Sequence, residues 1–407
     1  MRGFAERADV EDVERFLVER TALLAAEDVA LDACAGRVLA TDVVSACAVP
    51  AFPRSAMDGF AVRGEDTFGA SAYDPLAFRV VGESLPGRPF AGRVARGEAV
   101  RIMTGAPLPD GADAVVQAEV CTERNETLEV RDAVTPQKHV GAIGEDVRVG
   151  DVVLRTGRRL RPQDAGLLAS IGEARVRCVR QPRVRLVITG DELLPPGVRP
   201  EGSCIVDSNS VVLRALVARD GGVTPPHELL PDRPEAIRAE LARPDCDVFL
   251  VSGGSSVGQE DHAPRLVAEL GSLDFHGVAM RPSSPAGVGR IDGRFVFLLP
   301  GNPVSCLCAY EFFAGPTLRA LGGRSRAWPH RRVTLPLARK LVSEVGRVDY
   351  VRVTIDDGRV VPLATSGASI LSSTVRAAGV VLVARAREGM PEGEPVEVLL
   401  YDDEAAP

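Results

Sequence analysis

Lysine is almost absent from this 407-residue sequence, whose only lysines are Lys138 and Lys340. Aromatic residues make up 4% of the chain, and the formal net charge at pH 7 is -8. A protein that coats nucleic acid needs a basic face, often with aromatic platforms, so this composition excludes nucleic acid as a partner. The basic residues are otherwise arginine, and an arginine at a ligand site can therefore stand where other proteins use lysine.

Long apolar runs are also missing. Nowhere do about 18 apolar residues follow one another, the length that a membrane-spanning helix needs. Residues 1–24 are charged and helix-like, without the apolar segment of a signal peptide. These absences predict a cytoplasmic protein with no membrane contact. Its 45% hydrophobic and 26% charged residues are typical of a globular chain, with room for two to four domains.

Several sequence motifs of known chemistry do not occur. The 8 cysteines form no C-x-x-C pair, and Cys306 and Cys308 would point to different faces of a helix. We therefore interpret the cysteines as buried small residues rather than a metal or redox site. The 5 histidines lie apart, and no Ser-His-Asp order stands out, which argues against catalysis by a side-chain nucleophile.

The most informative stretch is 248–261, in which an apolar strand runs into a Ser/Gly loop and ends on Glu260 and Asp261. A predicted helix at 262–270 follows. Backbone N–H groups at such a strand-to-helix loop bind phosphates and other oxyanions. The spacing fits neither a P-loop nor the G-x-G-x-x-G fingerprint. The loop residues offered to an anion are Ser252, Gly253, Gly254 and Ser255. Taken alone, the loop can equally be interpreted as an ordinary turn that binds no ligand.

Four more polar or glycine-containing segments belong to the same region. Thr189-Gly190-Asp191-Glu192 follows the predicted strand 184–188, and Pro300-Gly301-Asn302-Pro303 follows the strand 295–299. Asp232 precedes a short helix at 234–242, and Ser208-Asn209-Ser210 caps a helix that runs to Asp220. This alternation predicts a doubly wound α/β sheet with its ligand site at the carboxyl ends of the strands.

The flanking segments have a different period. Residues 49–144 show short β runs and turns, while 145–178 return to a helix-like pattern. Five predicted strands after Trp328 indicate a small β-barrel. We therefore predict an α/β multidomain protein with four domains, which are a discontinuous α-containing domain at 1–48 and 145–178, an inserted β-rich domain at 49–144, the α/β domain at 179–326 and a C-terminal β-barrel at 327–407.

Acidic residues gather at turns and strand ends. They are Asp58, Asp146, Glu192, Asp232, Glu260 and Asp261. Each one alone is expected to be a solvated surface residue, but carboxylates beside phosphate-binding loops suit Mg²⁺ shared with a phosphoester. The Thr-Gly-Ala-Pro turn at 104–107 would also leave the Thr104 hydroxyl exposed on a loop. Metal-assisted phosphoester chemistry is the function class that these residues favour.

Six ordered motifs resemble one known family. They are SAMDGFAV, RIMTGAPLPDGADAVV, ITGDEL, the position of Asp232, VSGGSSVGQED and LLPGNPVS. In this order and spacing they resemble the molybdopterin molybdenumtransferases of the MoeA and gephyrin E-domain family. The resemblance implies a homodimer of four-domain subunits, a molybdopterin-binding α/β domain and a site in a cleft between subunits. It also implies Mg²⁺-dependent insertion of molybdate into adenylylated molybdopterin, with release of AMP and molybdenum cofactor.

The resemblance assigns roles to particular positions. It implies catalytic roles for Asp58, Thr104, Asp146, Glu192, Asp232 and Asp261. It implies metal-ligand roles for Glu192, Asp232 and Asp261. It implies substrate-binding roles for Ser252, Gly253, Gly254, Ser255, Arg281, Ser284, Pro300, Gly301, Asn302, Pro303, Arg352 and Ser369. Beyond the substrates, the implied partners are an upstream adenylyltransferase and downstream chaperones of molybdoenzymes.

Two segments depart from the family pattern. Where the family usually has a segment like K-P-G-K-P, this chain has Arg281-Pro282-Ser283-Ser284-Pro285, so Arg281 keeps one positive charge and Ser284 loses the second. In the fourth domain, Ala368 takes the place of a serine, and Ser369 comes one residue late. The alternative hypothesis is therefore a MoeA-like paralogue with weakened or lost catalysis that acts as a binding or scaffold protein. A general nucleotide-sugar or NTP-hydrolysing enzyme is disfavoured because no P-loop is present.

Overall fold

The computed structural model describes residues 7–254, 262–364 and 367–402. Its chain divides into two compact units. The first consists of Met1–Glu27, Gly36–Val38 and Cys178–Pro407, and the second of Asp28–Ala35 and Leu39–Arg177. The division falls within strands β1 (Ala26–Ala30) and β12 (Arg175–Val179). The finer division into four domains stays a prediction.

A six-stranded sheet is the centre of the first unit, with strand order β16-β13-β17-β21-β20-β18. The first four strands run parallel, and β20 and β18 add an antiparallel edge. Their bounds are Leu229–Leu230 (β16), Val184–Thr189 (β13), Val248–Ser252 (β17), Arg294–Leu299 (β21), Gly287–Ile291 (β20) and Ser272–His276 (β18). The predicted doubly wound α/β domain is thus confirmed.

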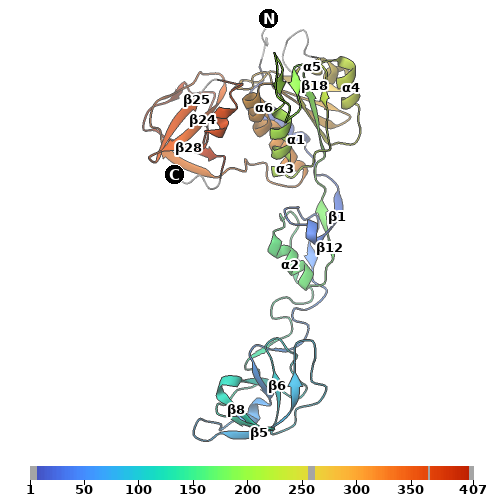
Figure 1. Cartoon of the computed structure of the whole chain (residues 1–407), viewed down its shortest axis with the longest axis vertical. Coiled ribbons are helices and arrows are strands. Elements are labelled where there is room, and N and C mark those ends of the chain that lie inside the picture. The colour runs from blue at the N-terminus through green and yellow to red at the C-terminus, as the bar shows by residue number, and fades with distance from the viewer. Residues whose placement is uncertain (1–6, 255–261, 365–366, 403–407) are drawn as a thin grey trace. The chain divides into compact units, whose positions relative to one another are not determined.

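Both faces of the parallel strands are buried, because successive side chains of a strand point to opposite faces. On one face Leu250 packs in a core with helices α1, α3, α6 and α7, and on the other Phe249 and Val251 pack with α4 and α5. Figure 1 labels α1, α3 and α6 on one side of the sheet and α4 and α5 on the other. Their bounds are Val10–Arg20 (α1), Asn209–Arg219 (α3), Pro234–Leu241 (α4), Ala263–Leu270 (α5), Pro303–Ala309 (α6) and Gly315–Leu321 (α7).

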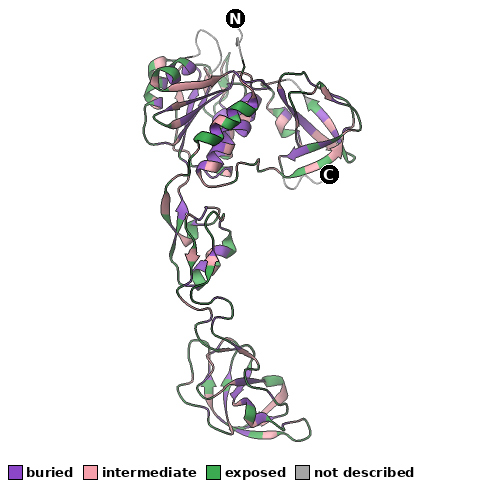
Figure 2. Cartoon of the chain, turned by 180° about the vertical axis from the view of Figure 1, so that it is seen from behind, coloured by how far each residue is buried: buried purple, intermediate pink, exposed green. Residues whose placement is uncertain are grey.

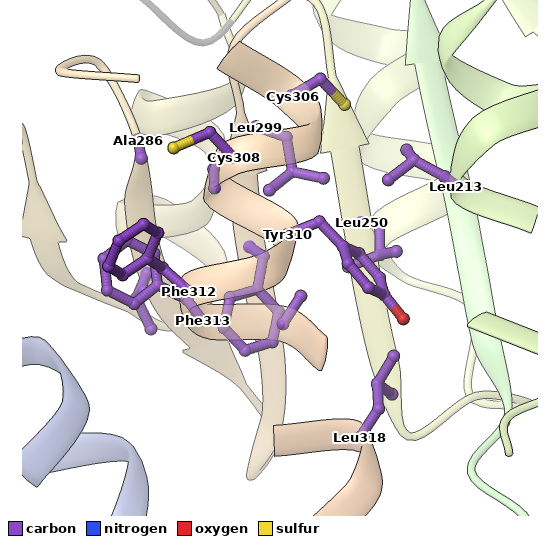
Figure 3. Packing of buried hydrophobic residues seen from close by; sticks show 14 of the residues in the cluster. Leu213, Leu250, Ala286, Leu299, Cys306, Cys308, Tyr310, Phe312, Phe313 and Leu318 are labelled. Carbon is purple, nitrogen blue, oxygen red and sulfur yellow. The ribbon is translucent and has the colours of Figure 1, made fainter. Parts of the chain in front are cut away.

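A π-helical turn at Tyr310–Ala314 joins α6 to α7 and carries three large aromatic side chains of this core. Figure 3 shows Tyr310, Phe312 and Phe313 between the sheet and the neighbouring helices. Tyr350 of the C-terminal sheet belongs to the same core, and its ring lies 6.4 Å from that of Phe312. The α/β domain and the C-terminal sheet therefore share one apolar core.

The C-terminal sheet has the order β19-β24-β26-β28-β22, with β25 also paired to β24. An isolated bridge from Leu337, just after β22, to Val360 in β25 joins its two sides and gives the predicted barrel. Strand bounds are Met280–Arg281 (β19), Val348–Asp356 (β24), Gly379–Val383 (β26), Pro395–Leu400 (β28), Arg332–Pro336 (β22) and Arg359–Ala364 (β25). A smaller ladder pairs Leu341–Val342 (β23) with Gly389–Met390 (β27), and helix α8 is Ser372–Val375.

The second unit contains a six-stranded sheet of order β7-β4-β6-β5-β9-β8. Its strands are Ala114–Gln117 (β7), Gly59–Val62 (β4), Glu98–Ile102 (β6), Leu76–Ser84 (β5), Thr127–Val130 (β9) and Cys121–Arg124 (β8). Short pairs of Val43–Val44 (β2) with Val152–Leu154 (β11), and of Arg54–Ser55 (β3) with Val140–Gly141 (β10), accompany helix α2 (Pro162–Ser170). Figure 2 shows that buried residues follow the strands within this unit. Across the described parts of both units, no helix combines the length and apolarity needed to cross a bilayer.

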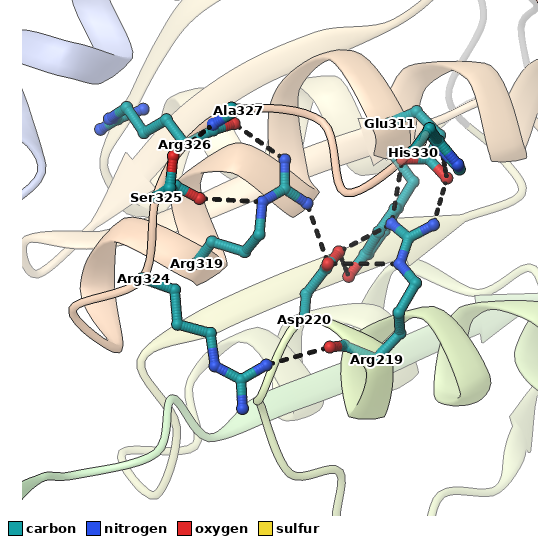
Figure 4. Close-up of polar contacts among 10 residues, drawn as sticks. Arg219, Asp220, Glu311, Arg319, Arg324, Ser325, Arg326, Ala327 and His330 are labelled. Atoms are coloured by element: carbon teal, nitrogen blue, oxygen red, sulfur yellow. Dashed lines mark hydrogen bonds and ion pairs between the residues drawn. The ribbon is translucent and has the colours of Figure 1, made fainter. Parts of the chain in front are cut away.

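A buried ionic network lies beside the core of the first unit (Figure 4). Arg219 donates two hydrogen bonds to Glu311, at 2.6 and 2.9 Å, and another to Asp220 at 2.9 Å. Arg319 also donates to Asp220, at 2.9 Å. His330 Nε2 lies 3.5 Å from Glu311 Oε1, an electrostatic contact at the outer limit of a hydrogen bond. Burial raises the pKa of Glu311, but the contacts with His330 and Arg219 outweigh it and lower the pKa to about 2.

We expect Glu311→Gln to lower the free energy of unfolding at pH 7 by on the order of 3 kcal/mol, because it breaks a buried ion pair. A carboxylate whose pKa is depressed on folding stabilises the protein above its ordinary pKa. The difference between wild type and variant should therefore shrink as the pH falls from the ordinary 4.5 toward 2. Urea unfolding at several pH values measures it. Glu397→Gln, in an exposed pair with Arg332, is the control and should cost less than about 1 kcal/mol. Equal losses in the two variants would contradict this account.

Candidate functional site

The carboxyl ends of three parallel strands lie level in the α/β sheet. Ser252, the last residue of β17, is opposite Ile188 in β13 and Leu299 in β21. The loops that follow these strands therefore emerge at one edge of the sheet, as the sequence predicted.

Close backbone packing joins two of these loops. Gly253 has φ +99°, and a Cβ added there would lie 2.2 Å from the Thr189 carbonyl oxygen. No larger residue fits this position without moving the backbone. Gly301 is also near, because a Cβ added to it would lie 3.8 Å from the Gly253 Cα. Glycine at 253 thus lets the loops after β13, β17 and β21 converge.

A cavity of about 570 Å³ opens where these loops meet. Seven residues predicted from the sequence line it, namely Glu192, Ser252, Gly253, Gly301, Asn302, Pro303 and Ser369. Sequence reasoning did not assign a ligand-site role to the four other polar residues of the lining, Thr189, Asp207, Ser208 and Asn209. Glu192 and Asp207 carry the only formal charges among the described residues of this wall. An anion here would be held by backbone N–H groups, hydroxyl groups or a bridging cation rather than by a lining arginine or lysine.

Asn209 links three elements at the cavity. Its Nδ2 donates to Ser252 Oγ at 2.9 Å and to the Gly301 carbonyl at 2.8 Å. The first residue of helix α3 is thereby fixed to the ends of β17 and β21. The sequence marked Ser208-Asn209-Ser210 only as a helix cap, so it contained no signal for this long-range contact.

The helix cap itself differs from the prediction. Ser208 occupies the N-cap position of α3 without a side-chain cap hydrogen bond. Asp207 takes over part of this role, because its Oδ1 accepts the Ser210 N–H at 3.1 Å. Asp207 follows β15 (Ile205–Val206), which pairs with β14 (Leu193–Leu194) beside the cavity.

The C-terminal barrel also reaches this cavity. The Val304 N–H at the start of α6 donates to the Ala368 carbonyl at 2.9 Å. This contact holds the 367–369 segment against the loop after β21 and places Ser369 on the cavity wall. Ser369, which comes one residue after the serine position of the family pattern, therefore lies beside the candidate site.

Other predicted residues lie at this edge of the sheet but outside the lining set. The Asp232 N–H donates to Asp191 Oδ1 at 3.3 Å, next to Glu192. Pro300 is buried, Ser284 is half-buried, and Gly254 follows Gly253 with φ +52°. Ser255 and Asp261 lie outside the described residues. Within residues 7–254, 262–364 and 367–402, no group of three or more His, Cys, Asp or Glu side chains is placed to hold a metal.

Arg281 is engaged with the barrel. Its Nη2 donates to Asp349, a residue 1% exposed, across the β19/β24 pairing. The same carboxylate accepts hydrogen bonds from Ser343 Oγ at 2.8 Å and Arg347 Nε at 3.1 Å. The positive charge of Arg281 is thus opposed by a buried carboxylate, and its role in substrate binding stays a prediction.

Arg352 lies further along β24, in the interior of the first unit. It is 1% exposed and follows Tyr350 on the strand face that is turned to the α/β core. Burial lowers the pKa of Arg352, with opposing contributions from Tyr401 and Tyr350. The described residues that line the cavity do not include it.

Asp58 and Thr104 form a hydrogen-bonded pair in the second unit. Asp58 Oδ1 accepts the Thr104 N–H and the Thr104 hydroxyl, each at 2.7 Å, and both residues are exposed. Two hydrogen bonds lower the pKa of Asp58. The larger effect comes from the Thr104 backbone N–H and the smaller one from its hydroxyl. Asp146, also exposed, donates its N–H to the Val49 carbonyl at 3.0 Å.

The same pairing occurs a second time in this unit. Asp42 Oδ1 accepts the Thr156 N–H at 2.7 Å and the Thr156 hydroxyl at 2.9 Å, and the pKa of Asp42 is lowered for the same reason. The geometry of Asp58 and Thr104 is therefore not distinctive by itself. It supplies a matched control for any role of Thr104.

The features described so far define a class of protein, in which a doubly wound α/β domain has a polar cavity at its strand ends and shares its core with a small barrel. Three family models cover most of the chain. The MoeA N-terminal region (domain I and II) matches residues 8–172, the "Probable molybdopterin binding domain" residues 185–320, and the MoeA C-terminal region (domain IV) residues 334–401. The chain belongs to the MoeA family.

Individual relatives agree with this assignment. Molybdopterin molybdenumtransferase 2 of Mycobacterium tuberculosis is 36% identical over 360 residues, which cover 85% of this chain and 87% of that protein. The molybdopterin molybdenumtransferase of Haemophilus influenzae is 33% identical over 379 residues, covering 90% and 92%. The crystal structure of a molybdopterin biosynthesis MoeA protein from Pyrococcus horikoshii superposes with a TM-score of 0.82 at 32% identity, covering 98% of this chain and 100% of that one.

For Arg281 and Asp349 we expect a coupling free energy of about 2 kcal/mol, since both groups belong to one largely buried network. A double-mutant cycle with Arg281→Gln and Asp349→Asn, followed by chemical unfolding, measures it. The exposed pair Arg238 and Glu269, treated with the same amide substitutions, should couple by about 0.5 kcal/mol or less. A similarly small value for Arg281 and Asp349 would show that the Arg281 charge is not committed to the barrel.

For the two Asp-Thr pairs we expect selective changes in pKa. Thr104→Ala removes one of the two hydrogen bonds to Asp58, so the pKa of Asp58 should rise toward its ordinary value while that of Asp42 stays constant. Thr156→Ala should do the reverse. NMR titration of the aspartate side chains measures both values. An unchanged pKa of Asp58 in Thr104→Ala would mean that the pair does not form in solution.

Proposed function

We propose that this chain is a molybdopterin molybdenumtransferase. It binds adenylylated molybdopterin and molybdate, inserts molybdate at the dithiolene, and releases AMP and molybdenum cofactor. The observation that carries the proposal is the similarity to relatives with this name over at least 85% of the chain. The cavity of about 570 Å³ lies within the segment that matches the molybdopterin-binding model, which supports the same function.

The chemistry of the cavity wall suits a phosphorylated substrate. Gly253 and Gly301 bring the loop backbones close together, and Ser252 and Ser369 add hydroxyl groups. Asn209 keeps the two glycine loops in place through its two hydrogen bonds. In this proposal the chain's own groups orient the phosphate side of the substrate, and the barrel closes one side of the cavity through Ser369.

Mg²⁺ is the proposed cofactor. Glu192 is suited to bind this ion, because its carboxylate supplies hard oxygen ligands on the cavity wall and takes part in no ion pair between described residues. Glu192, Asp232 and Asp261 would hold the ion, which supplies positive charge beside the phosphate when it is bound. Asp58, Thr104 and Asp146 are proposed as further catalytic residues.

Several finer assignments belong to the proposal as well. They are a homodimer with its site in a cleft between subunits, a cytoplasmic location, an adenylyltransferase that supplies the substrate, and chaperones that receive the product. The scaffold alternative is less favoured, because the relatives named as transferases match nearly the whole chain rather than one binding domain.

The test is to supply the purified protein with adenylylated molybdopterin, Mg²⁺ and molybdate, and to measure AMP and molybdenum cofactor. We expect turnover by wild type and a decrease of about 100-fold in Thr104→Ala, as for the loss of one catalytic hydrogen-bond donor. Thr156→Ala, which removes the equivalent bond to Asp42, should keep the wild-type rate. No turnover, together with failure to complement an insertase-deficient strain, would leave the scaffold alternative.

A further inference from the structure

A second cavity of about 830 Å³ lies next to the candidate site, between helix α3 and strand β16. Most of its wall is apolar, with Pro195, Pro196, Val211 and Leu229 among the lining residues. Arg214 Nη2 lies 2.7 Å from His227 Nδ1 on this wall, so two of its basic groups contact each other. The composition suits a flat, mostly apolar ring better than an anion.

Asp207 and Leu193 line both cavities and so form a shared wall. Asp207 is 4% exposed. Its Oδ1 accepts the Ser210 N–H, whereas Oδ2 is buried and has no hydrogen-bond partner among the described residues. A buried carboxylate oxygen without a donor is unfavourable, and more so for a charged group than for a neutral one. This arrangement indicates a position that receives a donor when a ligand is bound.

Thr189 repeats this feature on the other side of the site. It is the last residue of β13, is 3% exposed, and lines the first cavity. Its hydroxyl oxygen is likewise buried without a partner in the described part of the chain. Two elements therefore leave a polar side-chain atom unsatisfied beside one cavity. Buried polar atoms normally have a hydrogen-bond partner, so each of these two atoms needs one, and a ligand in the cavity could supply it.

We propose that the two cavities form one bipartite site for a nucleoside 5′-phosphate that carries an amino group on its base. The phosphate lies at the glycine loops of the first cavity, and the base enters the second. Asp207 Oδ2 accepts a hydrogen bond from the exocyclic amino group, which can donate but carries no charge of its own. Because Oδ2 is shielded from solvent in the free protein, the side chain turns toward the base as it binds.

This inference rests on the proposed function, in which the substrate contains an adenylyl group and AMP is a product. It adds where the adenine lies and which residue recognises it. Asp207 is thereby a specificity-determining residue. Its role is measured by the ratio of the affinities for two ligands rather than by the rate of the reaction. A second copy of this chain packed against the apolar cavity is the competing occupant, and the test separates the two.

The first test is isothermal titration calorimetry of the full-length protein with AMP and with purine riboside 5′-monophosphate, which lacks the amino group, both in the presence of Mg²⁺. Asp207→Asn keeps an oxygen for the Ser210 N–H but replaces the second oxygen by a donor. We expect it to weaken AMP binding by about tenfold or more and to leave the amino-free ligand within about twofold. Glu228→Gln, a charge loss at the second cavity but not at the first, is the matched control and should change neither.

An equal loss for both ligands in Asp207→Asn, or no loss for either, overturns the inference. The thermal midpoint of the unliganded variant should stay at or above that of wild type, since the substitution removes a buried charge that has a hydrogen-bond donor on only one of its two oxygens. A large fall of the midpoint, with AMP affinity unchanged, would assign Asp207 to the helix cap alone.

The second test fills the apolar cavity with Val211→Trp on α3, a position 54% exposed. We expect both nucleotides to bind at least about tenfold more weakly, while the molar mass by light scattering stays that of wild type. Unchanged affinity with an altered molar mass would assign the cavity to a contact between copies of the chain. If wild type turns over but binds no AMP, the inference fails and the proposed function stands. If wild type binds AMP selectively through Asp207 but does not turn over, the proposed function fails alone.

Discussion

Burial of both faces of the parallel strands β13, β17 and β21 is the constraint on which the first unit depends. With helices against each face, most side chains of these strands are apolar and buried, and polar backbone can meet a ligand only where the strands end. The level ends of the strands bring three loops to one edge of the sheet. Gly253 allows these loops to approach closely enough to enclose a cavity, and Asn209 holds them there.

Charge is distributed around this site in an unusual way. The cavity wall carries Glu192 and Asp207. Arg281 and Arg352, to which the family resemblance assigns substrate binding, are not among the described residues that line it. Arg281 is opposed by Asp349 of the barrel, and Arg352 lies in the interior between barrel and sheet. The planar guanidinium of Arg281 donates to the Asp349 carboxylate, so this residue contributes to the structure as well as to the local charge. The barrel is thus tied to the α/β domain by charge as well as by the shared aromatic core.

The sequence predicted three of the four parallel strands, β13, β17 and β21, to within about one or two residues, because their apolar runs are bounded by glycine and proline. It did not predict the short strand β16. It also predicted the strand-end loops, and seven of the named residues line the cavity. It did not reveal the partners of Arg281, Asp207 and Asn209. Arg281 and Asp349 are separated by 68 positions, and Asn209 meets residues 43 and 92 positions away. No local periodicity encodes contacts at such distances.

The sequence by itself determined the fold class, the family and the edge of the sheet where a ligand is expected. These depend on short-range patterns, which are the period of buried strands, the turn residues and the order of motifs. Only the tertiary structure decided which polar groups are already satisfied and which are left for a ligand. Asp58 with Thr104 and Asp42 with Thr156 have the same local geometry, whereas Asp207 Oδ2 stands out only because no residue of the described ranges donates to it. Hydrogen-bond satisfaction is a property of neighbours in space, and the chain acquires those neighbours only when it folds.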